Sequence, residues 1–165
     1  MDMLQVGRGM TYEEDKAHFS MCCLMHSPLL LGNDLTNISE ETLGIITNKN
    51  LISINQSEFV YQARRLIDYG EMEVWGKPLV STMSGQVVVA LLNRTAEKQA
   101  ISFNLTELGI NPQKKYSTKD LWTNEVSESM CDSILSYQVP AHGVVVLKLS
   151  GSSLPYNVYQ FKDEK

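Results

Sequence analysis

Residues 2–35 read DMLQVGRGMTYEEDKAHFSMCCLMHSPLLLGNDL, and this stretch decides the fold class of the N-terminal part of the chain. It contains a helix with a well-marked start, because Thr11 suits the N-cap position and Glu14, three residues on, can complete a capping box. The helix is expected to end before Pro28, since the residue preceding a proline disfavours the helical conformation. Apolar residues fill most of positions 17–25. We therefore expect this helix to be buried on several sides.

A short apolar strand and a second helix follow. Residues 29–31 form a continuous apolar run of the kind found in a parallel strand that is covered on both faces. Ser39 can cap a helix that extends through Ile46. Helix, buried strand and helix form the unit of an α/β fold. A barrel closes only with about eight βα units in roughly 250 residues, and this chain supplies fewer than two. We therefore expect residues 1–56 to be the incomplete C-terminal end of a (β/α)8 TIM barrel.

From about residue 71 the sequence pattern changes from helical to β. Six short runs separated by turn residues are typical of an antiparallel β-sandwich. The expected strands are 71–75, 86–93, 99–105, 115–121, 133–139 and 144–149. We accordingly expect a linker at 57–70, a β-sandwich domain at 71–149 and a polar tail at 150–165. The predicted fold class is α/β plus all-β, a barrel remnant followed by an antiparallel β-sandwich.

Composition excludes several classes of function. The chain has 165 residues and a formal net charge of −5, so a nucleic-acid partner is not expected. No apolar run approaches the roughly 20 residues of a membrane span, so no membrane partner is expected either. The three cysteines, Cys22, Cys23 and Cys131, imply no disulfide framework. Metal-ligand spacings are absent, so we expect no metal and no other cofactor. The sequence leaves the oligomeric state open.

Several motifs occur in one order along residues 2–149. They read DMLQVG at 2–7, GMT at 9–11, HFS at 18–20, SPLLLGNDL at 27–35, ITNKNLISINQ at 46–56, QAR at 62–64, EVWGKPL at 73–79, DLW at 120–122 and VPAHG at 139–143. In these places the chain resembles glycoside hydrolase family 27, which holds α-galactosidases and α-N-acetylgalactosaminidases. The resemblance implies a (β/α)8 barrel followed by an antiparallel β-sandwich, and retaining hydrolysis of terminal α-galactosides.

The chain departs from the family pattern at three places. Cys22 stands where a tryptophan is usual, and Thr36 stands where an arginine is common. Residues 57–60 replace the usual Asp-Pro-Leu-Gly turn at the junction of barrel and sandwich. The third departure bears on the angle between the two domains rather than on the chemistry.

The resemblance also assigns the site residues. Retaining hydrolysis needs two carboxylates about 5 Å apart. In the family both are aspartates upstream of the motif that contains Asp2, so no catalytic residue is expected in this chain. Asp2 and Met3 match positions that line the pocket for the terminal sugar, and an ionised carboxylate binds sugar hydroxyls strongly. The implied partner is an α-galactoside substrate of a longer parent protein, which is expected to be secreted or periplasmic.

For the other chemically capable residues we favour structural roles. His18 is more simply a hydrogen-bonded histidine of the helix than a catalytic base. Asn33 and Asp34 follow a barrel strand, where functional residues collect, yet their types suit turn stabilisation. Trp75 and Trp122 are interpreted as core residues rather than as a sugar-stacking platform.

The same reasoning covers the two other histidines and one acidic cluster. His26 and His142 lie beside helix and turn boundaries, where structural hydrogen bonds are expected. Residues 13–15 are acidic and begin the first helix. Adjacent helical residues diverge by about 100°, so these carboxylates do not form a catalytic pair.

Three hypotheses follow. The first is the C-terminal portion of a retaining α-galactosidase-like hydrolase, inactive as the isolated chain. The alternative is a β-sandwich that acts as a carbohydrate-binding or interaction module without catalysis. A third is a truncated reading frame with no role of its own. We also expect residues 11–26 and 29–31 to expose a large apolar patch, so deletion of residues 1–56 should improve solubility.

Overall fold

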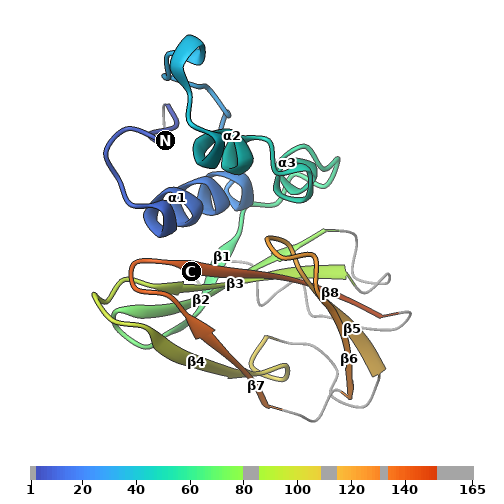
Figure 1. Ribbon diagram of the computed structural model, residues 1–165. Coiled ribbons are helices and arrows are strands. Elements are labelled where there is room, and N and C mark those ends of the chain that lie inside the picture. The colour runs from blue at the N-terminus through green and yellow to red at the C-terminus, as the bar shows by residue number, and fades with distance from the viewer. Residues whose placement is uncertain (1–2, 80–85, 109–114, 131–133, 152–165) are drawn as a thin grey trace, which may run out of the picture.

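The computed structural model describes residues 3–79, 86–108, 115–130 and 134–151. Residues 3–63, here called the helical layer, lie against one face of a sheet, and a second, smaller sheet lies on the opposite face (Figure 1). The two sheets form the sandwich, which begins at residue 64. The fold class is therefore confirmed, with short helices followed by an antiparallel β-sandwich.

The helical layer contains three α-helices and one 3-10 helix among the described residues. They are α1 (Tyr12–Leu24), η1 (Leu35–Asn37), α2 (Glu40–Ile46) and α3 (Lys49–Asn55). The expected capping box is present at the start of α1: the Thr11 hydroxyl accepts from the Glu14 N–H at 3.4 Å, and Glu14 Oε2 accepts from the Thr11 N–H at 2.8 Å. The hydrogen bonds from Thr11 lower the pKa of Glu14. Ser39 caps α2, as its sequence predicts.

The sandwich contains eight strands among the described residues. They are β1 (Arg64–Asp68), β2 (Met72–Pro78), β3 (Gln86–Asn93), β4 (Gln99–Asn104), β5 (Lys115–Asp120), β6 (Val126–Met130), β7 (Ile134–Val139) and β8 (Val144–Ser150). The large sheet has the order β1-β2-β3-β8-β5-β6, and the small sheet pairs β4 with β7. All strand pairs are antiparallel.

Two of these strands differ from the sequence analysis. Strand β1 lies within the range 57–70 that we expected to be a linker, and its pairing with β2 makes residues 64–68 part of the large sheet. Strand β6 was not expected at all. Both are edge strands of the large sheet. Edge strands often carry charged and polar residues. These residues interrupt the alternation of apolar and polar positions from which a strand is predicted.

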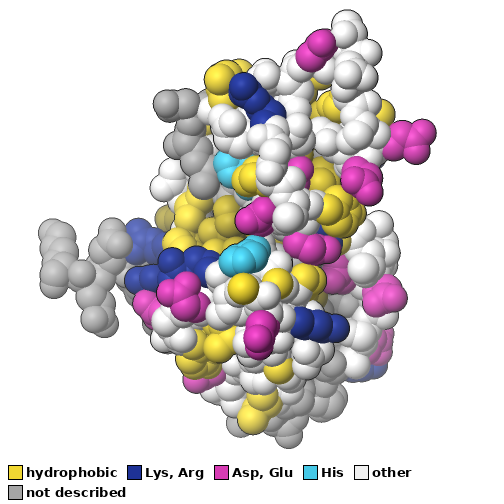
Figure 2. All heavy atoms as spheres, turned by 60° about the vertical axis from the view of Figure 1, so that its left-hand side comes forward, with side chains coloured by type: hydrophobic (Ala, Val, Ile, Leu, Met, Phe, Trp, Pro, Cys, Tyr) yellow, Lys and Arg dark blue, Asp and Glu magenta, His cyan; other side chains and the backbone are white. Residues whose placement is uncertain are grey.

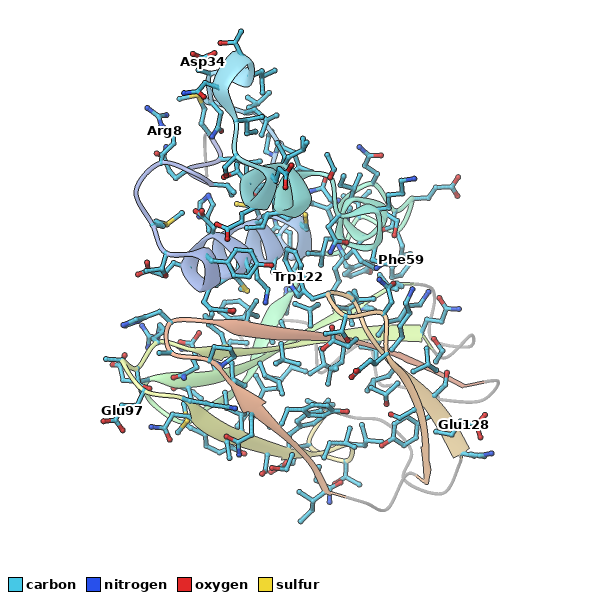
Figure 3. All side chains as sticks on the ribbon, in the orientation of Figure 1. Arg8, Asp34, Phe59, Glu97, Trp122 and Glu128 are labelled. Atoms are coloured by element: carbon cyan, nitrogen blue, oxygen red, sulfur yellow. The ribbon has the colours of Figure 1, made fainter. Side chains whose placement is uncertain are left out.

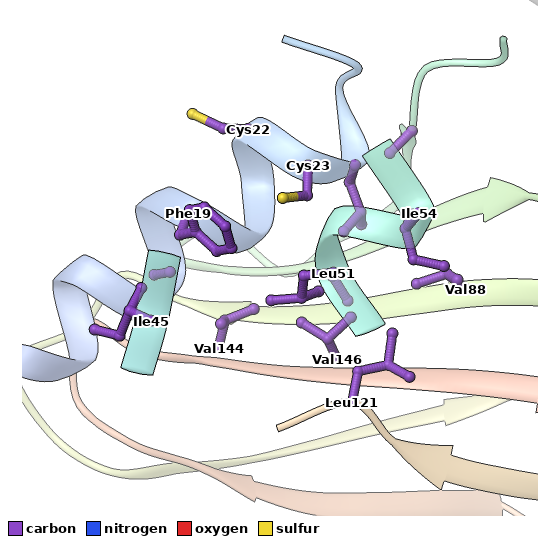
Figure 4. Packing of buried hydrophobic residues seen from close by; sticks show 14 of the residues in the cluster. Phe19, Cys22, Cys23, Ile45, Leu51, Ile54, Val88, Leu121, Val144 and Val146 are labelled. Atoms are coloured by element: carbon purple, nitrogen blue, oxygen red, sulfur yellow. The ribbon is translucent and has the colours of Figure 1, made fainter. Parts of the chain in front are cut away.

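Two hydrophobic clusters hold the molecule together. The first, here called the inner core, lies between the two sheets and comprises Val74, Val87, Val89, Leu91, Ile101, Phe103, Leu105, Leu108, Tyr116, Leu135, Val139, Leu147 and Leu149. The second, here called the interface cluster, joins the helical layer to the outer face of the large sheet. It comprises Leu4, Val6, Ala17, Phe19, Cys22, Cys23, Leu24, Ile45, Leu51, Ile54 and Ala63 with Leu79, Val88, Ala90, Leu121, Val144 and Val146. Figure 4 shows members of this cluster from α1, α3 and the sheet pointing toward one another.

Strand β3 shows how the two clusters share one sheet. Val87 and Val89 belong to the inner core, and Val88 and Ala90 belong to the interface cluster. Side chains of a strand alternate between its two faces, so β3 is apolar on both. The large sheet is thus covered on both sides, by the small sheet and by the helical layer.

The expected apolar patch is only partly present. The prediction is wrong for α1, because residues 19–24 of this helix are all buried, most of them against α2, α3 and the large sheet. It is right for the residues after the helix, where Leu30, Leu31 and Leu35 are 57%, 41% and 63% exposed. Hydrophobic side chains also gather at the surface between the helical layer and the sandwich, with charged groups around them (Figure 2).

The expected strand at 29–31 is reduced to a single parallel bridge between Leu4 and Leu31. The Leu4 N–H donates to the Leu30 carbonyl at 2.9 Å. A parallel strand of a barrel needs a partner on each side, and the described residues supply one. We expected residues 29–31 to be covered on both faces. The structure shows that they are not.

Polar contacts fix the helical layer on the sheet. The side-chain amides of Asn48 and Asn50 donate to the Leu121 carbonyl at 3.1 and 3.0 Å. At the end of α1, the Leu24 carbonyl accepts from the Ala63 N–H at 3.0 Å and from Lys77 Nζ at 3.4 Å. The last two bonds satisfy the Leu24 carbonyl, which an isolated helix end would leave without a partner.

Candidate functional site

Two loops meet at one edge of the helical layer. The bridge between Leu4 and Leu31 runs parallel, so residues 7–10 and 32–38 follow their strands at the same end. Asn33 Nδ2 donates to the Val6 carbonyl at 2.7 Å and joins the two loops directly. The carboxyl ends of parallel barrel strands are where the functional residues of this architecture gather. We call residues 3–10 together with 29–38 the strand-end edge.

Met3 and Arg8 close over Gly32 at this edge. A Cβ placed on Gly32 would lie 2.9 Å from Arg8 Nη1 and 3.6 Å from Met3 Sδ. Met3 remains 47% exposed. The absence of a side chain at Gly32 lets a guanidinium and a thioether come together at the surface. Of the two expected sugar contacts, Met3 therefore lies at the strand-end edge, and Asp2 lies outside the described residues.

A polar hollow of about 420 Å³ lies beside these residues. Its lining consists of Gly7, Arg8, Gly32, Asn33, Asp34, Asn37, Ile38, Ser39 and Thr42. Arg8 and Asp34 lie on the same side of the helical layer, away from the sandwich (Figure 3). The hollow offers a cation together with amide and hydroxyl groups, which suits a polar ligand.

Asp34 stabilises its own turn, and Asn33 does not. Asp34 Oδ1 accepts from the Thr36 N–H at 2.9 Å and from the Thr36 hydroxyl at 2.6 Å, and these bonds lower the pKa of Asp34. Asn33 Oδ1 is buried without a hydrogen-bond partner among the described residues. The turn-stabilising role is confirmed for Asp34, whereas the Asn33 side chain joins the two loops through Val6 instead of bonding within its own turn.

Two side chains of α1 hold the loop at 4–8 from below. Asp15 Oδ2 accepts from the Gly7 N–H at 2.9 Å, and His18 Nε2 lies 3.2 Å from the Gln5 nitrogen as acceptor. Burial raises the pKa of Asp15 and lowers the pKa of His18. A neutral imidazole has one acceptor nitrogen, and an imidazolium has none. The lowered pKa therefore favours the form that holds Gln5, and the structural role expected for His18 is confirmed.

Both tryptophans lie at the interface cluster rather than on an open surface. Trp122 Nε1 donates to the Ser20 hydroxyl of α1 at 3.1 Å, and Trp75 Nε1 donates to Glu73 Oε2 at 2.8 Å. Each is partly buried and packs against the interface cluster. Figure 3 shows Trp122 between the helical layer and the large sheet. They are packing residues, as expected, and form no sugar-stacking platform.

The remaining histidines and acids are also structural. His26 has φ of 53° and lies with Nε2 3.4 Å from the Phe59 carbonyl, and His142 has φ of 50° in the turn before β8. Glu13 forms an ion pair with Lys16 at 3.3 Å. Glu14 accepts a hydrogen bond from the Thr11 N–H as part of the N-terminal capping box. The acidic residues at the start of α1 thus have separate roles, as expected.

Sequence reasoning did not single out two charged groups. Arg8 at the strand-end edge is one, and its only sequence signal is a position between two glycines in the loop after a strand. The other is Glu73, which is 5% exposed and accepts from Trp75, from Arg65 at 3.0 Å and from Arg94 at 3.3 Å. This network lies in the large sheet and holds strands β1, β2 and β3 together.

Other kinds of site are not seen in the described part of the chain. No group of three or more His, Cys, Asp or Glu residues there could hold a metal ion. No helix there is both long and apolar enough to cross a bilayer. Cys22 and Cys23 are buried thiols, and burial raises the pKa of Cys23 to about 12. Cys131 lies outside the described residues.

Comparison with known proteins decides the family. Residues 69–149 match the model of the alpha galactosidase C-terminal beta sandwich domain, and residues 1–57 match the model of alpha galactosidase A. The chain belongs to glycoside hydrolase family 27 and corresponds to the C-terminal portion of its α-galactosidases. The family resemblance drawn from the motifs is confirmed.

Individual family 27 relatives agree with this assignment. Alpha-galactosidase A of Cellvibrio japonicus is 40% identical over 161 residues, which cover 91% of this chain and 38% of that protein. The crystal structure of alpha-galactosidase I from Mortierella vinacea superposes with a TM-score of 0.85 at 30% identity, over 93% of this chain and 39% of that one. The Saccharomyces cerevisiae α-galactosidase with raffinose gives 0.78 at 25% identity, over 90% and 46%. The chain thus spans less than half the length of these relatives.

Proposed function

We propose that residues 1–165 form the C-terminal portion of a retaining glycosidase that cleaves terminal α-linked galactose from oligosaccharides or glycoconjugates. In this proposal Asp2 and Met3 contact the terminal sugar, and neither catalytic carboxylate belongs to this chain. The matched relatives are named α-galactosidases, and one of them is a complex with raffinose, an α-galactoside. The proposal that the sandwich is only a binding module is not favoured, because the matches run through both parts of the chain.

The observation that carries the proposal is the parallel bridge between Leu4 and Leu31. It reproduces two neighbouring strands of a barrel joined by α1, with their following loops side by side. Met3 is exposed next to Gly32 at this edge. A side chain in this place can line a pocket whose other walls come from further barrel strands.

Inactivity of the isolated chain is supported by the use of its buried acids. Retaining hydrolysis needs two carboxylates about 5 Å apart, one of them free to attack the sugar. Asp15 accepts a hydrogen bond from the Gly7 N–H. Glu73 forms ion pairs with Arg65 and Arg94 and accepts a hydrogen bond from Trp75. Neither acid is free at the strand-end edge, so neither is a good candidate for a catalytic carboxylate at the sugar site proposed there.

The sandwich then has a mechanical role in the glycosidase. Helix α1 lies between the strand-end edge and the large sheet, and contacts both. Asp15 and His18 hold the loop that follows Met3, while Phe19 and Cys23 pack on the sheet side. A binding residue is positioned best by a rigid supporting structure. The sandwich therefore fixes the orientation of Met3 and Arg8 through α1.

The proposal is tested by a chimera in which residues 1–165 replace the matching part of the Cellvibrio japonicus relative. We expect no hydrolysis of an aryl α-galactoside by the isolated chain and measurable hydrolysis by the chimera. Asp2→Asn in the chimera should lower kcat/KM by about 10- to 100-fold, because a charge-assisted hydrogen bond to the sugar is weakened. Glu97→Gln, a change at an exposed acid of the sandwich outside the helical layer, is the matched control and should have no effect.

Three results would contradict the proposal. Turnover by the isolated chain would show that it holds its own catalytic groups. A folded but inactive chimera would show that this chain does not complete a working barrel. Equal kcat/KM for Asp2→Asn and Glu97→Gln would remove the sugar-binding role of Asp2.

A further inference from the structure

A second hollow lies in the sandwich, on the opposite side of the large sheet from the helical layer. Its volume is about 410 Å³, within the range of about 300–1,000 Å³ that is usual for small-molecule sites. It is formed where β5, β6 and β8 of the large sheet face β7 of the small one. Its lining includes the polar and apolar side chains of Thr118, Asp120, Glu125, Ser127, Tyr137 and Leu147.

Strand register puts these groups on one face. Thr118 is paired with Ser127 of β6, and Asp120 is paired with Leu147 of β8. Directly paired residues project to the same side of a sheet, and so do residues two apart on a strand. The intervening Lys119 points the other way, because its Nζ donates to Asn50 Oδ1 of the helical layer at 3.0 Å. The four paired residues therefore face the space between the two sheets.

Thr118 is the most informative residue of this hollow. It is only 3% exposed, and its hydroxyl oxygen is buried without a hydrogen-bond partner among the described residues. A buried hydroxyl without a partner is costly, and valine would fill the same volume without that cost. The hydroxyl is explained if a ligand in the hollow provides the missing hydrogen bond.

Asp120 and Tyr137 add an acceptor and a donor. Asp120 Oδ1 accepts from the N–H groups of Trp122 at 2.7 Å and Thr123 at 2.9 Å, while Oδ2 has no hydrogen bond within the described part of the chain. Tyr137 of the small sheet is half-buried, and burial, with Tyr116 and Asp120 nearby, raises the pKa of its phenol. Tyr137 therefore keeps its proton and can donate.

The chemistry of the lining selects a class of ligand. Carboxylates accept hydrogen bonds, hydroxyls both donate and accept, and Leu147 with the Tyr137 ring offers an apolar surface. The described lining contains no lysine, arginine or histidine. A sugar presents hydroxyl donors at its edge and C–H groups on its faces, which matches this combination. We propose that the hollow between β5, β6, β7 and β8 binds a neutral sugar of hexose size, at a site separate from the strand-end edge.

The experiment is a titration of the 165-residue chain with D-galactose and with D-glucose, followed by backbone amide NMR. We expect saturable shifts, in the millimolar range of a weak monosaccharide site, at residues of β5, β6 and β7. Residues 4–8 and 32–38 should not shift. Ethylammonium, a small cation, is the comparison probe, because two carboxylates could also attract a positive charge.

Matched variants then assign the shifts. Thr118→Val should weaken sugar binding about fivefold to tenfold, the effect of losing one hydrogen bond, without lowering the melting temperature. Ser117→Ala is the control, because Ser117 neighbours Thr118 on β5 and faces the other side of the sheet. It should bind sugar as the parent does. Ser127→Ala changes an exposed residue on the binding face, so it provides a second test should Thr118→Val fail to fold.

Three outcomes would overturn the inference. They are the absence of saturable shifts with either sugar, saturation with ethylammonium but with neither sugar, and sugar affinity unchanged in both Thr118→Val and Ser127→Ala. None of them bears on the proposed function, because the chimera assay depends on the strand-end edge and this titration on the sandwich.

Discussion

The sandwich buries its inner core between its own two sheets, whereas the helical layer buries α1 against a sheet that belongs to the sandwich. Every residue of the inner core comes from the β part of the chain. The interface cluster takes residues from both parts, among them Phe19 of α1 and Val146 of β8. The two regions therefore depend on the interface unequally. The helical layer has no core of its own, while the sandwich has one.

The large sheet nevertheless needs the helical layer for its outer face. Val88, Ala90, Val144 and Val146 of this face are 0–2% exposed, and all belong to the interface cluster. Without the helical layer these residues would form an apolar patch of the kind that leads to association. The boundary between barrel and sandwich is clear in the sequence. In the folded chain the interface cluster extends across this boundary without a break.

Removing residues 1–56 should have the largest effect. The structure reverses our expectation from sequence, since deletion uncovers the outer face of the large sheet. We expect aggregation on size-exclusion chromatography and binding of a hydrophobic dye. The same deletion carrying Val88→Thr and Val146→Thr should be more soluble. A shortened chain that stays monomeric and melts at the parent's temperature would show that the large sheet does not need the helical layer on its outer face.

Two buried phenylalanines separate the regions more finely. Phe103 lies in the inner core and Phe19 in the interface cluster, each 1% exposed. Each change to alanine should cost about 3–5 kcal/mol of local packing. We expect Phe103→Ala to lower the unfolding temperature by the same amount whether it is followed by circular dichroism or by tryptophan fluorescence. Phe19→Ala should shift mainly the fluorescence, because both tryptophans border the interface cluster. Equal shifts of both probes in both variants would mean that the regions unfold as one.

Lys77 gives the interface a pH dependence. It is fully buried at the end of α1, and burial lowers its pKa from 10.5 to about 8. Below pH 8 the amine is charged in both states, and the folded state carries the full cost of burying that charge. Between pH 8 and 10.5 the folded amine loses its proton first, so the stability of the parent should rise there.

Lys77→Met should lack this rise. The difference in the free energy of unfolding between the parent and this variant should therefore change by an amount on the order of 2 kcal/mol between pH 8 and 10.5. Urea unfolding at several pH values measures it. Both proteins keep Cys23, whose thiol pKa of about 12, raised mainly by burial, makes stability fall above pH 9. The burial part of that fall is common to both proteins, so the difference reports Lys77 together with its interaction with Cys23. Parallel pH profiles for the two proteins would show that Lys77 is not buried as a titrating group.

Met3→Ala should have the smallest effect on stability, below about 0.5 kcal/mol, because nearly half of the side chain is exposed. In the chimera the same change should raise KM for an aryl α-galactoside, since Met3 is proposed to contact the sugar. Thermal unfolding of the isolated chain and kinetics of the chimera measure the two effects. A large loss of stability with unchanged KM would assign Met3 to the fold instead.

Sequence predicted what depends on local signals. The cap at Thr11, the burial of α1 and the central strands β3 and β8 follow from capping chemistry and apolar runs. The edge strands β1 and β6 were missed, because their residues are polar and their order comes from pairing with a neighbour. The covering of α1 by the sandwich was missed as well, since nothing in a helical pattern says which surface will cover it.

The candidate site was predicted only through the family motif. Met3 and Asp2 have no local signal that marks a sugar contact. Arg8 was not expected, because its place over Gly32 depends on the parallel pairing of two loops that lie 24 residues apart in sequence. Lys77 lies in a recognisable motif, yet its burial arises from the contact with the end of α1.

The most direct test of the account is amide hydrogen exchange, compared between the isolated chain and the chimera with a completed barrel. Leu30 and Leu31 are exposed here, while β3 and β8 are buried on both faces. We predict fast exchange at residues 30 and 31 in the isolated chain and slow exchange in the chimera, with β3 and β8 slow in both. Residues 30 and 31 that exchange equally in the two proteins would contradict the claim that this edge is completed by the rest of a glycosidase barrel.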